Sequence, residues 1–183
     1  METTKNKLPP FAQSFFKKLS IYLDTPIYFY GSVQRNDYFL KYSDIDVDIF
    51  TNNENSLVNK IQNFLNISKQ DFKKFVYKLH ITKELVNGIK IKYEDIDNNF
   101  STDISIYNKK YKESVLIEHN SKVQLPFIIS TLIIILKFIY YQLNILPSEM
   151  YLSIKKFLMN FCVEGKDVEF VSIDIPKHEK EEE

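Results

Sequence analysis

Cysteine, glycine and arginine are scarce in this chain of 183 residues. The single cysteine, Cys162, excludes an internal disulfide framework and a cysteine-rich zinc cluster. The three glycines are too few for a phosphate-binding loop that is built from several of them. Arg35 is the only arginine, so lysine carries almost all of the positive charge. The 24 lysine and arginine residues balance 24 aspartate and glutamate residues, which excludes a strongly basic nucleic-acid-binding protein but not a local basic patch.

Long apolar runs are also missing. Residues 1–10 are polar and lack the apolar stretch of a signal peptide. The most apolar run, Leu125–Leu136, ends at Lys137, well short of the roughly 20 residues that cross a bilayer. We therefore expect a cytoplasmic protein with no membrane span, in which this run forms a buried helix. A lysine within such a run is costly unless it meets an anion.

The hydrophobic content of 44% and the charged content of 26% predict a packed fold. Apolar residues at helical spacing predict helices over 11–23, 56–67, 122–143 and 148–161. Alternating or β-branched runs predict strands over 27–30, 44–50, 73–82, 88–93, 102–107 and 168–175, with a hairpin turn at Asn87-Gly88. This order predicts an α+β fold: a small mixed sheet with flanking helices and a short helical part at the C-terminal end. We expect a core domain over 1–113, a helical extension packed on it over 114–176, and a mobile acidic tail over 177–183.

The most informative segment is the predicted strand 44–50, in which acidic and aliphatic residues alternate strictly. Its acidic residues are Asp44, Asp46 and Asp48. On a strand all three share one face, while the aliphatic residues point to the core. Carboxylates side by side repel one another, so a compensating divalent cation is expected, and magnesium is the hard cation that suits them. A solvated acidic face is the alternative, whereas an EF-hand is disfavoured because Ile49 and Asn55 stand where that loop needs Gly and Glu.

Two further elements belong to the same pattern. Gly31 and Ser32 end a short apolar strand, where glycine allows close backbone approach and a serine hydroxyl with free amides can hold a phosphate. Asp103 lies on the later predicted strand 102–107, and a neighbouring strand would place it beside Asp44 and Asp46.

Other candidates are weaker. Asp95 and Asp97 fall where the apolar alternation stops, so we interpret them as loop acids. His80, His119 and His178 have no metal-like spacing, and we expect them to be structural or exposed.

Together, Tyr30-Gly31-Ser32, the strand that begins at Asp44 and the later Asp103 resemble the signature of the polymerase-β-like nucleotidyltransferase superfamily. The resemblance covers about residues 27–107. It implies transfer of a nucleoside monophosphate (NMP) from a nucleoside triphosphate (NTP) to an acceptor hydroxyl. Asp44, Asp46 and Asp103 would be catalytic and would hold two Mg²⁺ ions, or Mn²⁺, while Gly31 and Ser32 would bind the nucleotide. Asp48 has no counterpart in the signature, so an Asp46/Asp48 metal pair stays open beside Asp44/Asp46.

The C-terminal part is similar to the helical segment of noncanonical poly(A) and terminal uridylyl transferases. Lys137 within an apolar run and Tyr151 in the next predicted helix carry this similarity. It implies that Lys137 contacts the triphosphate, that Tyr151 stacks on the base and that the acceptor is an RNA 3′ end. The chain departs from the pattern at Tyr141, where a second lysine often stands, and at Met150, which replaces a serine.

Two alternatives remain open. One is a minimal nucleotidyltransferase of the toxin–antitoxin or antibiotic-modifying type, which modifies a protein or a small molecule. The other is a noncatalytic NTP-binding or scaffolding subunit with the same fold. Whether a partner subunit or a homo-oligomer completes the helical part also stays open.

Overall fold

The computed structural model describes residues 2–162 and 171–174, and the predicted tail 177–183 lies outside them. Among the described residues the strands form a six-stranded mixed sheet in the order β1-β2-β5-β4-β3-β6. Of the neighbouring strands that the structure describes, β2 and β5 pair in parallel and the others are antiparallel. The strands are β1 (Tyr28–Tyr30), β2 (Ile45–Thr51), β3 (Lys73–Lys78), β4 (Leu85–Asp95), β5 (Phe100–Asn108) and β6 (Val171–Asp174).

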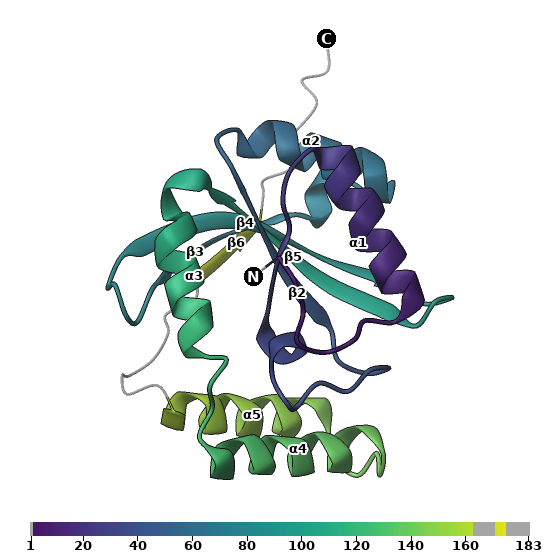
Figure 1. Ribbon diagram of the computed structural model, residues 1–183, viewed down its shortest axis with the longest axis vertical. Coiled ribbons are helices and arrows are strands. Elements are labelled where there is room, and N and C mark those ends of the chain that lie inside the picture. The colour runs from purple at the N-terminus through teal and green to yellow at the C-terminus, as the bar shows by residue number, and fades with distance from the viewer. Residues whose placement is uncertain (1, 163–170, 175–183) are drawn as a thin grey trace.

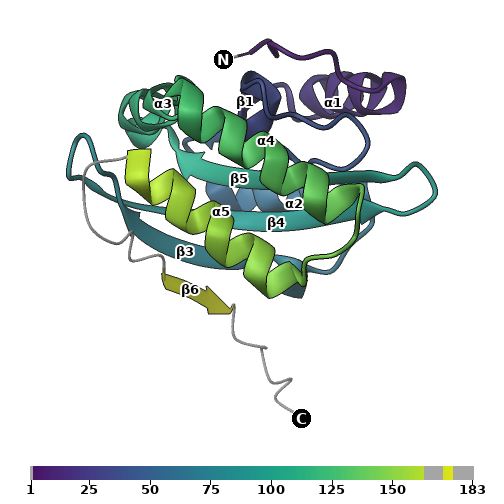
Figure 2. The same ribbon diagram turned by 90° about the horizontal axis from the view of Figure 1, so that it is seen from below.

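Helices cover both faces of this sheet (Figures 1 and 2). On one face α1 and α2 bury the aliphatic residues of β2 and β5, such as Val47 and Ile104. On the other face α3 packs over a second apolar cluster, and α4 and α5 lie side by side beyond it. The α-helices are α1 (Pro10–Leu23), α2 (Glu54–Leu65), α3 (Lys112–Ser121), α4 (Phe127–Tyr141) and α5 (Ser148–Cys162), and the 3₁₀ turns are η1 (Gly31–Gln34), η2 (Lys69–Asp71) and η3 (Lys109–Tyr111). The predicted α+β fold with a C-terminal helical part is therefore confirmed.

The predicted hairpin turn at Asn87-Gly88 is wrong. Both residues lie inside β4, where Gly88 pairs with Phe75 of β3, and the connection between the strands runs over 79–84. A β-carbon at Gly88 would lie 2.6 Å from Cζ of Phe75 and 2.8 Å from the carbonyl oxygen of Ile106. The glycine thus makes room for an aromatic ring from the next strand and does not form a turn.

The helix predicted over 122–143 corresponds to α4, but its predicted start is wrong, because α4 begins at Phe127. Pro126 precedes the first residue of α4. Proline cannot continue a helix from its N-terminal side, because it has no amide hydrogen and its ring clashes with the preceding turn. No helix within the described residues is both long and apolar enough to cross a membrane. The expected boundary between core and extension falls in the first turn of α3 and stays a prediction.

Candidate active site

The three predicted acids lie on one side of the sheet. In the parallel pair β2 and β5, Asp46 is the register partner of Asp103, and partners in adjacent strands point to the same face. Asp44 precedes β2 by one residue and shares this face by alternation. Burial and the neighbouring charges of Asp103 and Asp44 raise the pKa of Asp46 from 3.8 to about 7, and burial and Asp44 also raise the pKa of Asp103. The negative charges of these three aspartates therefore repel one another.

Asp48 points to the same face but has a different environment. Its side chain is fully buried, and Oδ2 lies 2.8 Å from Nε2 of His119 in α3. The ring of His119 in turn stacks on the ring of Tyr30, with centroids 4.0 Å apart. Burial raises the pKa of Asp48, and the adjacent imidazole lowers it. Asp48 thus has its own basic partner, which favours the Asp44/Asp46 pair over the Asp46/Asp48 pair.

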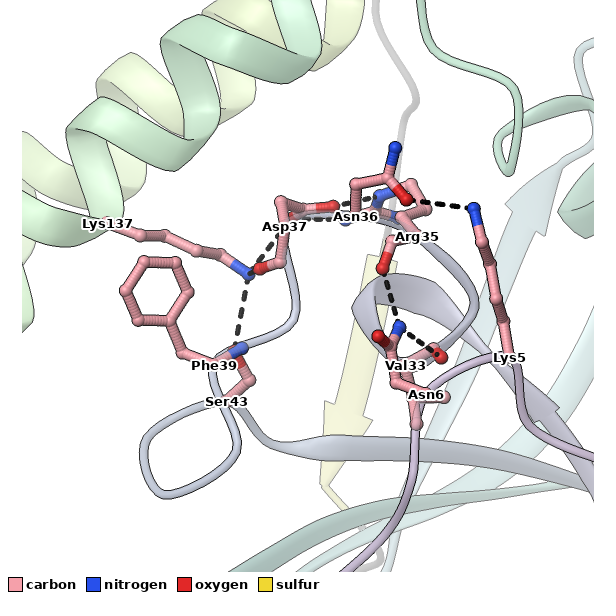
Figure 3. Close-up of polar contacts among 9 residues, drawn as sticks. All are labelled: Lys5, Asn6, Val33, Arg35, Asn36, Asp37, Phe39, Ser43 and Lys137. Carbon is pink, nitrogen blue, oxygen red and sulfur yellow. Dashed lines mark hydrogen bonds and ion pairs between the residues drawn. The ribbon is translucent and has the colours of Figure 1, made fainter.

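The Gly31-Ser32 turn lies directly against Asp46. Gly31 has a positive φ of 72°, and a β-carbon built on it would overlap the Asp46 carboxylate. Ser32 follows in η1 and is buried. Residues far apart in the sequence hold this turn, because Asn6 donates hydrogen bonds from Nδ2 to the carbonyl oxygens of Val33 (2.9 Å) and Arg35 (2.6 Å) (Figure 3).

A cleft of about 260 Å³ opens beside these residues, between η1 and β2 on one side and α3, α4 and α5 on the other. It brings together most of the predicted site residues, namely Gly31, Ser32, Asp44, Asp46 and Lys137. Asp103 and Tyr151 are not among the residues that line it. The lining residues to which the sequence assigned no role in the site include Arg35, Ser43, Lys122 and Lys155, and His119, which was expected to be structural or exposed, also lines the cleft. Arg35 could have been found as the one arginine, three residues after Ser32, whereas nothing in the sequence distinguishes Lys155 from the other lysines.

Lys137 meets an anion, as its apolar surroundings required, and that anion is Asp37. The Lys137 side chain is buried, and its Nζ lies 2.9 Å from Oδ2 of Asp37 and donates hydrogen bonds to the Asp37 carbonyl oxygen (2.6 Å) and to Oγ of Ser43 (3.3 Å) (Figure 3). Arg35 donates from Nε to the other Asp37 oxygen at 2.7 Å. Burial lowers the pKa of Lys137 to about 8, although Asp37 opposes this shift. The lysine ties α4 to the loop before β2, and its contact with a triphosphate stays a prediction.

Tyr151 is buried against another ring. It stacks on Tyr140 at a centroid distance of 4.1 Å and an interplanar angle of 8°. The tyrosine of the α4–α5 hairpin that lines the cleft is Tyr141, whose ring stacks on Tyr42 at 5.3 Å. The role of Tyr151 as a base-stacking residue therefore stays a prediction, and Tyr141 is the better placed aromatic ring.

Within the described residues, no three His, Cys, Asp or Glu side chains are grouped closely enough to form a ready-made metal site. The donor chemistry of Asp44, Asp46 and Asp103 still suits a hard divalent cation, because all three offer carboxylate oxygens from one face of adjacent strands. Their mutual repulsion leaves negative charge that a cation would compensate. The carboxylates therefore fit magnesium in type, and its binding remains a prediction.

One comparison with known proteins bears on this cleft. A family model described as "Nucleotidyltransferase domain" matches residues 12–123. The match contains Gly31, Ser32 and the three acids, and it ends before α4. No curated protein and no solved structure matches the chain significantly.

Proposed function

The chain belongs to the nucleotidyltransferase-domain family, and we propose that it transfers NMP from an NTP to an RNA 3′ hydroxyl in a magnesium-dependent reaction. The observation that carries this proposal is the strand register, which places Asp46 opposite Asp103. Asp44 and Asp46 also line a cleft whose other wall is basic. The basic residues of that wall are Lys122, Lys137 and Lys155, while Arg35 lies at the end of η1 on the side of Ser32. Acids suit the cations that accompany an NTP, and basic side chains suit its phosphates.

Asp44, Asp46 and Asp103 would hold the magnesium ions. When bound, these ions supply positive charge that stabilises the attacking and leaving oxygens of an in-line displacement. Ser32 would donate its hydroxyl to a phosphate oxygen, and Gly31 allows the backbone to approach. In the reaction the acceptor oxygen forms a bond to the α-phosphorus while the bond to pyrophosphate breaks. The Asp103 carboxylate would accept the proton of the acceptor hydroxyl.

An RNA acceptor is supported by the hairpin of α4 and α5, which has the lysine and the tyrosine of the RNA-tailing pattern. The cleft also offers the ring of Tyr141, on which a base could stack. One observation favours the alternative of a small-molecule or protein acceptor. The only arginine is buried against Asp37 and the net charge is zero, so a long RNA-tracking surface is lacking among the described residues.

Incubation with labelled NTPs, magnesium and an RNA oligonucleotide tests the proposal. Extension of the RNA is expected, and Asp46→Asn and Asp103→Asn should abolish it. Asp97→Asn is the matched control, because Asp97 is an exposed acid in the loop between β4 and β5. If a protein or a small molecule is labelled and the RNA is not extended, the RNA acceptor is contradicted and the alternative acceptor is supported. NTP binding without any transfer would favour a noncatalytic subunit.

A further inference from the structure

Among the described residues, four lysine and arginine side chains line the cleft, and three of them already have an acidic partner. Arg35 and Lys137 share the fully buried Asp37. Lys122 in turn lies 2.8 Å from Oε1 of Glu118. A charge held by a buried carboxylate is poorly available to a ligand, because its departure would leave the carboxylate uncompensated.

Lys155 of α5 is the exception. Among the described residues it has no ion pair with a carboxylate, and its Nζ lies over the ring of Tyr151, 5.7 Å from the centroid. It is partly buried and lines the same cleft as Asp46 and Lys137. The positive charge of Lys155 lowers the pKa of Asp46 and the pKa of Lys137, so Lys155 lies within electrostatic reach of both side chains.

We propose that Lys155 is the lysine that binds the triphosphate of the NTP, while Lys137 holds α4 in place. This inference rests on the proposed function. A flexible ammonium without a carboxylate partner keeps its full attraction for a polyanion. Its position across the cleft from the acids places positive charge on the side opposite to the expected cations.

The test compares Lys155→Ala with Lys156→Ala, which removes an exposed lysine from the next position of the same helix. Lys155→Ala should weaken the binding of magnesium–ATP and of magnesium–tripolyphosphate at least tenfold in calorimetry. It should also raise KM for the NTP by a similar factor, with a smaller change in kcat. Lys155→Arg should restore most of the affinity, and Lys156→Ala should bind as the wild type does. Circular dichroism would establish that each variant is folded.

If the wild type binds the nucleotide and folded Lys155→Ala binds it equally well, the inference is overturned and the proposed function stands. If the wild type binds neither ATP, GTP, UTP nor CTP and transfers no nucleotide, the proposed function is overturned as well.

A second inference comes from the outer surface of α4 and α5, which is apolar. Figure 2 shows these two helices in front of the sheet with no other element over them. The exposed apolar side chains, each 36% to 84% accessible, are Phe127, Ile128, Leu132, Ile135 and Phe138 of α4 and Met150, Ile154 and Phe157 of α5. The only charged residue of α4 is the buried Lys137, so the outer face of this helix has no charge.

We infer that this outer surface binds the same surface of a second copy of the chain. The exposed area of these side chains is on the order of 800 Å², about what each partner contributes to a standard interface. Two antiparallel helices related by a two-fold axis to an identical pair form a four-helix arrangement that buries both apolar faces.

Sedimentation velocity at micromolar concentration tests this second inference. The wild type should sediment as a dimer, and the double variant Ile128→Glu/Ile135→Glu as a folded monomer. Ile96→Glu is the control, because Ile96 is 90% exposed in the loop between β4 and β5 and should leave the dimer intact. A monomeric wild type, or a dimer that survives the double variant, would overturn the inference.

Discussion

The carboxylate of Asp46 occupies the space that a β-carbon at position 31 would need. Gly31 therefore serves two purposes: it adopts a positive φ, and it allows the Gly-Ser turn to lie against the central acid of the cleft. This contact joins the proposed phosphate-binding turn to the proposed metal-binding strand, so the two parts of the site depend on each other.

Gly31→Ala should damage both the backbone and the site. The positive φ alone costs about 1–2 kcal/mol for a residue with a β-carbon, and the overlap would displace the Asp46 side chain. We expect a lower unfolding free energy in urea and at least a tenfold loss of transfer. Gly88→Ala is the control, because it strains the packing against Phe75 far from the cleft. If the two variants lose similar stability but also similar activity, the special role of Gly31 is contradicted.

Asp46→Asn should separate stability from activity. The substitution removes one charge from a cluster of like charges, so the metal-free protein should be as stable as the wild type or more stable. Transfer should fall by several orders of magnitude, because a ligand of the expected cations is lost. Thermal unfolding with and without magnesium measures the first effect, and magnesium should raise Tm of the wild type but not of the variant. A variant with wild-type activity would rule out a catalytic role for Asp46.

The stability of the metal-free protein should decrease with rising pH in a defined window. The pKa of Asp46 rises from 3.8 to about 7 on folding. Between these values the folded protein binds this proton and the unfolded chain does not, so the unfolding free energy falls as the pH rises. The difference in unfolding free energy between wild type and Asp46→Asn, measured at pH 4, 5.5 and 7, isolates this contribution. A difference that is independent of pH would show that Asp46 does not titrate in this range.

Lys137→Met should destabilise the fold more than it affects nucleotide affinity. It leaves the fully buried Asp37 with Arg35 as its one remaining basic partner, and loss of a partner from a buried pair costs about 3 kcal/mol. Lys92→Met is the control, because Lys92 pairs with Glu94 at an exposed site that contributes about 0–1 kcal/mol. Urea denaturation measures both variants. A stable Lys137→Met variant with greatly weakened NTP binding would instead support the original assignment of Lys137 to the triphosphate.

Local pattern was sufficient where a residue's environment follows from its immediate neighbours. The helical spacing in 11–23 and the strict alternation in 44–50 predicted α1 and β2 closely. It failed at Gly88, because the group that requires a glycine there is the ring of Phe75 on another strand. It also began the helix of α4 too early, at residue 122, because apolar spacing alone outweighed the stop at Pro126.

The sequence by itself determined that the aspartates of β2 share one face, because side chains alternate along any strand. It also determined that Lys137 needs an anion, because an unpaired charge in an apolar run is too costly. Only the tertiary structure decided that Asp46 faces Asp103, that Asp48 is paired with His119, that the anion of Lys137 is Asp37 and that Lys155 reaches the cleft. These are pairings between residues far apart in the chain, and they depend on strand register and helix packing, which no local pattern specifies.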